Sequence, residues 1–250
     1  MSKKIYCLIK TYDCEEYAEA FINAGEMYCR TLKEFKETER DNDRGDEFEG
    51  TSHWFQAKDT KISLTVRNEN DEVLNATDIG ESDLAGPTVL QPVIFDGFNL
   101  FCMYAIVIED FEESYSTEDE KKLLKEEINK SIADQIRIDP RYRSFGDHAV
   151  VIYKVEGFVE TVVSHAKSNN MKICHGLVDY FDPERFTGSF KGVEAIFRKR
   201  KAYSHQNEFR FAFNTNNKTH GPITINVGPL NEFAFIGPLE DIVEQLKIEI

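Results

Sequence analysis

The sequence lacks the features that mark exported and membrane-spanning chains. Its five cysteines are odd in number and scattered, with no Cys-x-x-Cys pair. They are Cys7, Cys14, Cys29, Cys102 and Cys174. Such a set predicts neither a disulfide framework nor a zinc site. No run of about 18 apolar residues is present, the length that a spanning helix needs, and the N-terminus has no signal-peptide pattern. We therefore expect a soluble, cytoplasmic protein.

Several enzyme signatures and an excess of basic charge are also missing. There is no glycine-rich phosphate loop and no Gly-x-Ser-x-Gly, so kinase, hydride-transfer and serine-hydrolase chemistry have no support. Thirty Lys and Arg residues face 45 Asp and Glu residues, for a formal net charge of -15. This charge argues against general binding to nucleic acid or to an anionic membrane. It leaves room for a basic partner or for a local basic patch.

The chain has enough apolar residues for a sizeable core, with 41% hydrophobic and 12% aromatic residues in 250. We expect a single domain over residues 1–250. Helices are interspersed among hairpin-like strands without a regular βαβ alternation. This order predicts an α+β fold with mixed, mainly antiparallel sheets and flanking helices.

Local patterns predict the individual elements. Residues 4–11 read as a strand, followed by a helix that Asp13 caps and Gly25 ends, and then by a short strand over 26–32. Thr117 and Glu120 form a capping box for a helix over 117–137. Residues 33–55 read as a long loop with a turn at Arg44-Gly45-Asp46. Further strands are predicted over 61–67, 73–79, 88–95, 99–108, 148–155, 171–181, 223–227 and 232–237, and further helices over 157–170 and 239–246.

One stretch, "SHQNEFRFAFN" at 204–214, carries the most informative pattern. In a strand, Phe209, Phe211 and Phe213 would share one face, while Gln206, Glu208, Arg210 and Ala212 would share the other. The phenylalanine face predicts burial. The opposite face is either solvated, as in many half-buried strands, or lines a site.

The stretch also resembles part of a known superfamily. A Gln-x-Glu on a late strand, in a chain that opens with a strand, a helix, a glycine and a short strand, resembles the ADP-ribosyltransferase superfamily. The opening, "IYCLIKTYDCEEYAEAFINAGEMYC", is similar in layout to bacterial toxins that ADP-ribosylate DNA. The spacing of Lys199, Tyr203, Glu208 and Arg210 is similar to that in bacterial defence-associated domains. These pieces cover about a quarter of the chain.

The resemblance implies a fold, a substrate and catalytic residues. The fold would be ADP-ribosyltransferase-like, and the substrate would be NAD, whose bond between nicotinamide and ribose is broken. Glu208 would stabilise the positive charge that develops on the ribose, and Gln206 would orient the acceptor. The protein would then be a transferase or an NAD glycohydrolase, acting as a bacterial or phage toxin or antiviral defence factor. Its acceptor is left open: protein, nucleic acid, a small molecule or water.

Other residues would hold NAD. In this superfamily the first strand commonly ends in an arginine or histidine that contacts the cofactor, and the matching place here is Lys10 or Thr11. Arg30 on the next strand is a substitute. Tyr104 or Tyr203 would stack on the nicotinamide ring.

Two further candidates for the phosphates are Arg210 and the basic run 198–201. Each has a structural alternative. Arg210 would be the ion-pair partner of Glu208, and the basic run would be an exposed turn.

Two other functions compete with this one. The first is a non-enzymatic acidic interaction protein that imitates a polyanion or inhibits a basic protein partner. The second is a metal-dependent nuclease, in which Asp46, Glu47 and Glu49 would bind a divalent ion together with Glu208. A loop rich in carboxylates is more often simply hydrated.

Overall fold

One long strand, β7 (Asn99–Glu109), organises the main sheet. The computed structural model describes residues 3–38, 46–109, 117–136, 145–215 and 221–245. Within these, β7 pairs antiparallel with β1 (Lys3–Tyr12), β2 (Glu26–Thr31) and β13 (Glu208–Asn214). A strand has only two edges, so two of these three partners must share one.

β1 and β2 share that edge and divide it between them. β13 pairs with residues 99–104 of β7 and so takes the opposite edge along that stretch. On the shared edge, β2 pairs with Asn99 and Leu100, and the β1 ladder starts at Tyr104. Residues 101–103 therefore have no ladder partner on this edge among the described strands. The sheet is split at this point.

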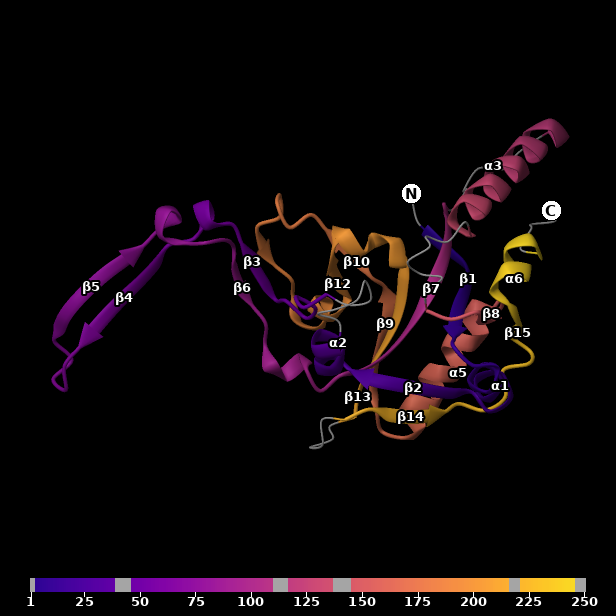
Figure 1. The fold of residues 1–250 in the computed structure, drawn as a ribbon, viewed down its shortest axis with the longest axis horizontal. Coiled ribbons are helices and arrows are strands. Elements are labelled where there is room, and N and C mark those ends of the chain that lie inside the picture. Colours follow the sequence, from indigo (N-terminus) through magenta and orange to yellow (C-terminus); the bar gives the residue numbers. More distant parts are fainter. Residues whose placement is uncertain (1–2, 39–45, 110–116, 137–144, 216–220, 246–250) are drawn as a thin grey trace.

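The remaining strands extend the sheet outward from these neighbours. β1 pairs with β8 (His148–Ile152), which pairs with β15 (Ala234–Pro238), and β13 pairs with β9 (Lys172–Leu177). β2 pairs with β14 (Ile223–Asn226), and these two strands run across the direction of the others (Figure 1). All these pairings are antiparallel, which confirms the α+β class with mainly antiparallel sheets.

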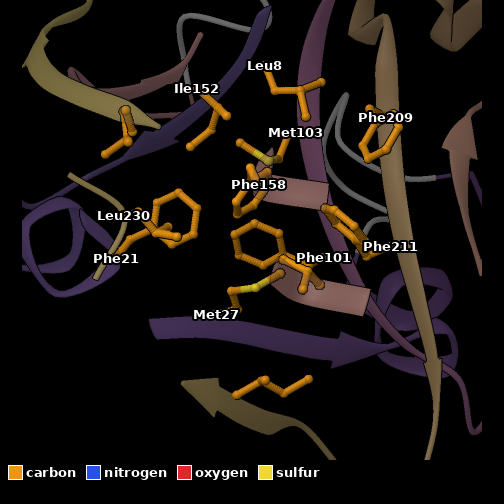
Figure 2. Close-up of a cluster of buried hydrophobic side chains, with 14 of the residues drawn as sticks. Leu8, Phe21, Met27, Phe101, Met103, Ile152, Phe158, Phe209, Phe211 and Leu230 are labelled. Atoms are coloured by element: carbon orange, nitrogen blue, oxygen red, sulfur yellow. The ribbon is translucent and has the colours of Figure 1, made fainter. Parts of the chain in front are cut away.

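Helices cover both faces of the sheet. α1 (Glu15–Ala24) and α5 (Val155–Ser168) bury Phe21 and Phe158 against one face, beside Phe211 of β13. Figure 2 shows these rings gathered in one cluster, where Phe158 meets Phe211 edge-on with centroids 5.6 Å apart. α3 (Glu118–Ile136) and α6 (Leu239–Gln245) pack on the other face, where their apolar residues join a second cluster. No helix among the described residues is long and apolar enough to cross a membrane.

Smaller elements lie beside the main sheet. β3 (His53–Phe55), β6 (Thr88–Leu90) and β11 (Gly188–Ser189) form one small sheet, and β10 (Asp179–Phe181) pairs with β12 (Arg198–Arg200). The hairpin of β4 (Ile62–Arg67) and β5 (Val73–Ile79), here called the arm, projects away from the rest of the protein (Figure 1). Short 3-10 helices lie at Ala57–Asp59, Glu81–Asp83, Val93–Phe95, Gly192–Phe197 and Lys201–Gln206.

Most predicted elements are present, with local corrections. The capping box of Thr117 and Glu120 is confirmed. The N-cap of α1 is Cys14 without a side-chain bond, so the prediction of Asp13 was wrong. The predicted loop 33–55 begins with a helix, α2 (Leu32–Thr38). This helix is started by a hydrogen-bonded exchange between Thr31 and Glu34.

Other corrections concern strand limits. The predicted strand 88–95 stops at Leu90 and continues as a 3-10 turn after Pro92, whose missing N–H suits it poorly to a ladder. β13 begins only at Glu208, because Asn207 has a left-handed backbone with φ of 38°. Gln206 therefore ends a 3-10 turn instead of sharing the strand. Arg44 and Gly45 of the predicted turn, and Leu246 of the last helix, lie outside the described residues.

We expect Gly25→Ala to destabilise the protein. Gly25 ends α1 with φ of 64°, and a Cβ there would lie 2.3 Å from the carbonyl oxygen of Gly228. The left-handed backbone alone costs roughly 1–2 kcal/mol for a residue with a side chain, and the clash adds to it. Urea unfolding should show this loss. Gly80→Ala is the matched control, because nothing lies within 4 Å of its added Cβ. Equal stability of the two variants would contradict the assignment.

Candidate functional site

A pocket of about 560 Å³ lies where the sheet splits. Its lining comes from the end of β1, the start of α1, the exposed face of β2, α2, residues 100–103 of β7, Lys199 of β12 and the start of β13. Glu208, Gln206, Lys10 and Arg30 all line it. The fold thus brings together predicted site residues from separate parts of the chain. Volumes of roughly 300–1,000 Å³ are usual for small-molecule sites.

Lys10 occupies the gap on the edge of β7. The β1 ladder ends at Ile9, and the Lys10 ammonium donates a hydrogen bond to the carbonyl of Cys102 at 2.9 Å. The same ammonium lies 4.9 Å from the centroid of the Phe101 ring. Burial lowers the pKa of Lys10. A side chain thus takes the place of a strand, which leaves space beside the sheet for a ligand.

Glu208 belongs to a closed ring of four buried charges, here called the charge ring: Glu49, Lys199, Glu208 and Arg210. The Lys199 ammonium donates to Glu208 Oε2 at 2.8 Å, and Arg210 Nε donates to Glu208 Oε1 at 2.6 Å. Glu49 faces the same two cations from the other side, with its oxygens 2.8 Å from Lys199 Nζ and 3.0 Å from Arg210 Nη2. Two cations and two carboxylates leave the ring formally neutral.

The turn that holds Glu49 is fixed to β12 by Asp46. Asp46 is fully buried and accepts hydrogen bonds from the backbone N–H of Arg200 at 2.8 Å and from Arg200 Nε at 2.7 Å. Its carbonyl also accepts from the N–H of Glu49 at 2.8 Å, which closes the turn. The acidic run 46–49 is therefore joined to the basic run 198–201 through two of its cations, Arg200 and Lys199. This contact positions the Glu49 carboxylate within the charge ring.

The charge ring keeps Glu208 ionised. Burial alone would raise the pKa of its carboxyl group, but the nearby charges of Arg210 and Lys199 lower it below its ordinary range. Burial likewise opposes the charge on Lys199, yet Glu208 and Glu49 raise its pKa. Each charge is thus maintained by its neighbours.

Gln206 joins Glu208 through Lys199. The Lys199 ammonium donates to Gln206 Oε1 at 2.7 Å while it also holds Glu208. Gln206 and Glu208 are therefore close together, as predicted. They are joined by Lys199, however, and not by sharing one face of a strand. The Glu208 backbone N–H donates to the Tyr180 hydroxyl at 3.0 Å, which fixes the start of β13.

Thr11, near the end of β1, also lines the pocket. Its side chain is largely buried, with 7% of the residue exposed, and it lines the pocket. Its hydroxyl has no hydrogen-bond partner within the described part of the chain. The hydroxyl is not fully buried, so water in the pocket can hydrate it.

The other predicted cofactor residues lie elsewhere. Tyr104 faces Glu208 across the ladder, but it belongs to the apolar cluster under α3, and its hydroxyl donates to the Gln135 carbonyl at 2.8 Å. The Tyr203 ring stacks near Arg200, with 5.7 Å between guanidinium carbon and centroid. Arg210 is fully buried in the charge ring and does not line the pocket. The ion-pair interpretation of Arg210 is thus confirmed.

Two of the alternatives that the sequence left open are excluded. The basic run is not an exposed turn: Arg198–Arg200 is strand β12, and Lys199 is 2% exposed. The face of β13 that carries Glu208 and Arg210 is not solvated either, because both residues are buried. Asp46 and Glu49 are occupied by cations, and no group of three or more possible metal ligands occurs among the residues that the structure describes.

Sequence reasoning named Lys199 within the basic run and Glu49 as a possible metal ligand, but it missed that the two pair with each other in the charge ring. Each was hidden inside a run of like charge that reads as a solvated surface. A signal was present, because aromatic residues flank both runs: Phe48 sits within the acidic run, and Phe197 and Tyr203 flank the basic one. Aromatic neighbours favour burial, and buried charges require opposite partners.

Comparisons with known proteins add no assignment. The chain matches no protein-family profile, no curated protein and no solved structure.

We expect Glu49→Gln to cost about 3–5 kcal/mol of stability, the usual result of removing one partner from a buried ion pair. Lys199 and Arg210 would then share a single carboxylate. The midpoint of urea unfolding measures the loss. Glu47→Gln is the control, because its side chain is 55% exposed and it lies 3.8 Å from Arg200. That change should cost less than about 1 kcal/mol. A wild-type midpoint for Glu49→Gln would show that the charge ring does not stabilise the fold.

The charge ring also predicts how stability depends on pH. The pKa of Glu208 is lower in the folded state than the value of about 4.3 for an unperturbed glutamate. Its contribution is therefore fully present above that unfolded value and is lost as the pH falls toward the folded pKa. The unfolding free energy should fall between about pH 5 and pH 3, and less steeply in Glu208→Gln. Identical slopes for the two proteins would contradict the lowered pKa.

Proposed function

We propose that the protein is an NAD-consuming enzyme of the ADP-ribosyltransferase type, with the pocket at the sheet split as its active site. The observation that carries the proposal is the convergence of Glu208, Gln206, Lys10 and Arg30 on this one pocket. The finer fold assignment belongs to the same proposal. It is supported by the order strand, helix, glycine and strand over 3–31 and by the split of β1 from β2.

The residues present suit the substrate. Lys10 and Arg30 offer two cations to a diphosphate, and Arg30 is exposed on the pocket face of β2. The pocket also has apolar and aromatic walls, including Phe35, Phe101 and Phe145, against which planar rings can pack. Its volume lies within the range of small-molecule sites. Tyr104 and Tyr203 do not line the pocket, so stacking falls to these phenylalanines instead.

Glu208 would stabilise the transition state by its fixed negative charge. As the bond from the ribose C1′ to the nicotinamide nitrogen breaks, its electron pair leaves with nicotinamide and positive charge develops on the ribose. A carboxylate that is already ionised and held at both oxygens needs no reorganisation to meet that charge. Water or another acceptor then bonds to C1′ and releases a proton to solvent. Lys199 and Arg210 act as positioning residues, because both hold the Glu208 carboxylate. Lys199 also lines the pocket, whereas Arg210 does not.

The two other functions have less support. A metal-dependent nuclease would need free carboxylates, but Asp46 and Glu49 are each held by cations. A non-enzymatic acidic protein would account for the charge of -15, but it gives no role to a pocket with ionised Glu208 in its wall.

The proposal predicts that the purified protein releases nicotinamide from labelled NAD and that Glu208→Gln abolishes the release. Because Glu208→Gln also disturbs the charge ring, its folding must be verified by circular dichroism and urea unfolding. Arg30→Gln gives a second test, since Arg30 is exposed and forms no ion pair with another described residue. The loss of a charged hydrogen bond, worth roughly 1.5–3 kcal/mol, should weaken NAD binding about tenfold or more.

The matched control is Arg67→Gln on the arm, away from the pocket. It should bind and cleave NAD like the wild type. The proposal fails if the wild type neither binds nor cleaves NAD, or if a folded Glu208→Gln cleaves it at the wild-type rate.

A further inference from the structure

A second groove, here called the edge groove, lies between α5 and the end of β9. Its volume is about 530 Å³, and it is open to solvent. Its walls come from the first two turns of α5, from β9, and from single residues of β1 and β13. The apolar residues among them are Ile5, Val155, Val159, Leu177 and Phe209. The edge groove shares no lining residue with the pocket at the sheet split, so it is a separate surface.

β9 borders the edge groove and has one free edge. It pairs with β13, and no other strand that the structure describes pairs with it. The Val178 N–H donates to the Glu208 carbonyl at 2.8 Å, so the alternation of an antiparallel ladder turns the backbone groups of Gly176 toward β13 as well. His175 and Leu177 therefore direct their N–H and C=O groups away from β13. These groups have no backbone partner among the described residues.

No feature of β9 prevents another strand from pairing with this edge. Proteins usually protect an exposed edge with a proline, a bulge or charged side chains. The strand contains no proline, and its register with β13 is regular. Its one charged side chain, that of Lys172, lies at the start of the strand, away from the edge groove. The edge is thus available for strand addition.

An added strand would place side chains in the edge groove. The side chains of His175 and Leu177 lie on the α5 face of the sheet, where they pair with Phe211 and Phe209 of β13. Residues directly opposite each other on neighbouring strands point to the same face. A segment paired with the free edge would therefore turn every second side chain toward α5, while its backbone bonds to β9.

Two carboxylates at the edge groove favour a positively charged segment. Glu156 and Glu160 lie four residues apart on α5, so they share one side of the helix, and both are exposed. Neither forms an ion pair with another described residue. A second copy of this chain would bring the same two carboxylates and a net charge of -15, and would be repelled. A basic partner would be attracted.

We propose that β9 and the edge groove bind an extended segment of a basic protein partner by strand addition. An apolar side chain of the segment enters the groove, and a lysine or arginine two residues away meets Glu156 or Glu160. Main-chain hydrogen bonds to the free edge of β9 supply affinity, and these two side chains supply selectivity. The interaction does not depend on the proposed enzymatic function.

The proposal is tested first with a short fluorescent peptide, Leu-Thr-Lys-Thr-Leu-Thr-Lys, in which threonine favours the extended form. Fluorescence anisotropy with the folded protein measures the Kd. We expect the peptide to bind, and a version with glutamate in place of lysine to bind at least about tenfold more weakly. The leucine and lysine amides are then N-methylated in one peptide and the threonine amides in another. One set should abolish binding and the other should not, because an extended segment turns only every second amide toward β9.

Two pairs of variants test the same site on the protein. His175→Pro removes an N–H that points away from β13, a place where an edge strand tolerates proline, and should abolish binding. His175→Ala also removes the ring but keeps the N–H, so it should bind within about threefold of the wild type. Glu156→Gln combined with Glu160→Gln should weaken binding about tenfold and reduce its dependence on salt. Glu15→Gln combined with Glu19→Gln on α1 is the matched control, since these residues are also exposed, four apart and outside the groove.

The outcomes decide whether the edge groove takes this partner. Lysine-selective binding that is lost in His175→Pro and kept in His175→Ala supports the proposal. Equal binding of the lysine and glutamate peptides, or equal effects of the two methylated sets, would overturn it. The methylated peptides decide the matter even if His175→Pro does not fold. A wild-type dimer in analytical ultracentrifugation that His175→Pro abolishes would assign the edge to a second copy of the chain and also overturn the proposal.

Discussion

The charge ring of Glu49, Lys199, Glu208 and Arg210 is the interaction on which the pocket depends. It joins three segments distant in sequence: the turn at 46–49, strand β12 and strand β13. Removing four charges from water is expensive, and the cost is offset only because each carboxylate meets both cations at close range. Each of the four charges therefore depends on its two neighbours in the ring. The ring thus fixes where Glu208 lies and keeps it charged.

The split of the sheet supplies the space beside that carboxylate. If β1 had continued its ladder along β7, residues 101–103 would be paired and the pocket would not exist. Lys10 covers part of the open edge with one hydrogen bond, so the backbone remains partly satisfied without a strand. The same divergence turns β2 across the sheet and aims its exposed face into the pocket. A single irregularity in strand pairing thus produces the cavity and also places the charges of Glu26 and Arg30 along its wall.

The sequence predicted the elements better than their connections. Periodicity located the helices and strands because Phe209, Phe211 and Phe213, like the apolar residues of α5, repeat at the spacing of their element. The link between Gln206 and Glu208 was right for a different reason, since it passes through Lys199 and not along a strand. Which charges are buried together could not be read locally, because Glu49 and Lys199 are 150 positions apart and meet only through the tertiary fold. The split of the sheet beside β7 could not be predicted either, because it depends on whether β1 or β2 pairs with each part of the same edge.

The arm has a consequence for how the protein opens. Among the strands that the structure describes, β4 and β5 pair only with each other, and nearly all of their side chains are exposed to solvent. A two-stranded ribbon of this kind is marginal by itself in water. Its amide hydrogens would thus exchange with deuterium while those of β7 and β13 stay protected, and a protease would cut there first. The arm can therefore unfold locally while the rest of the protein stays folded.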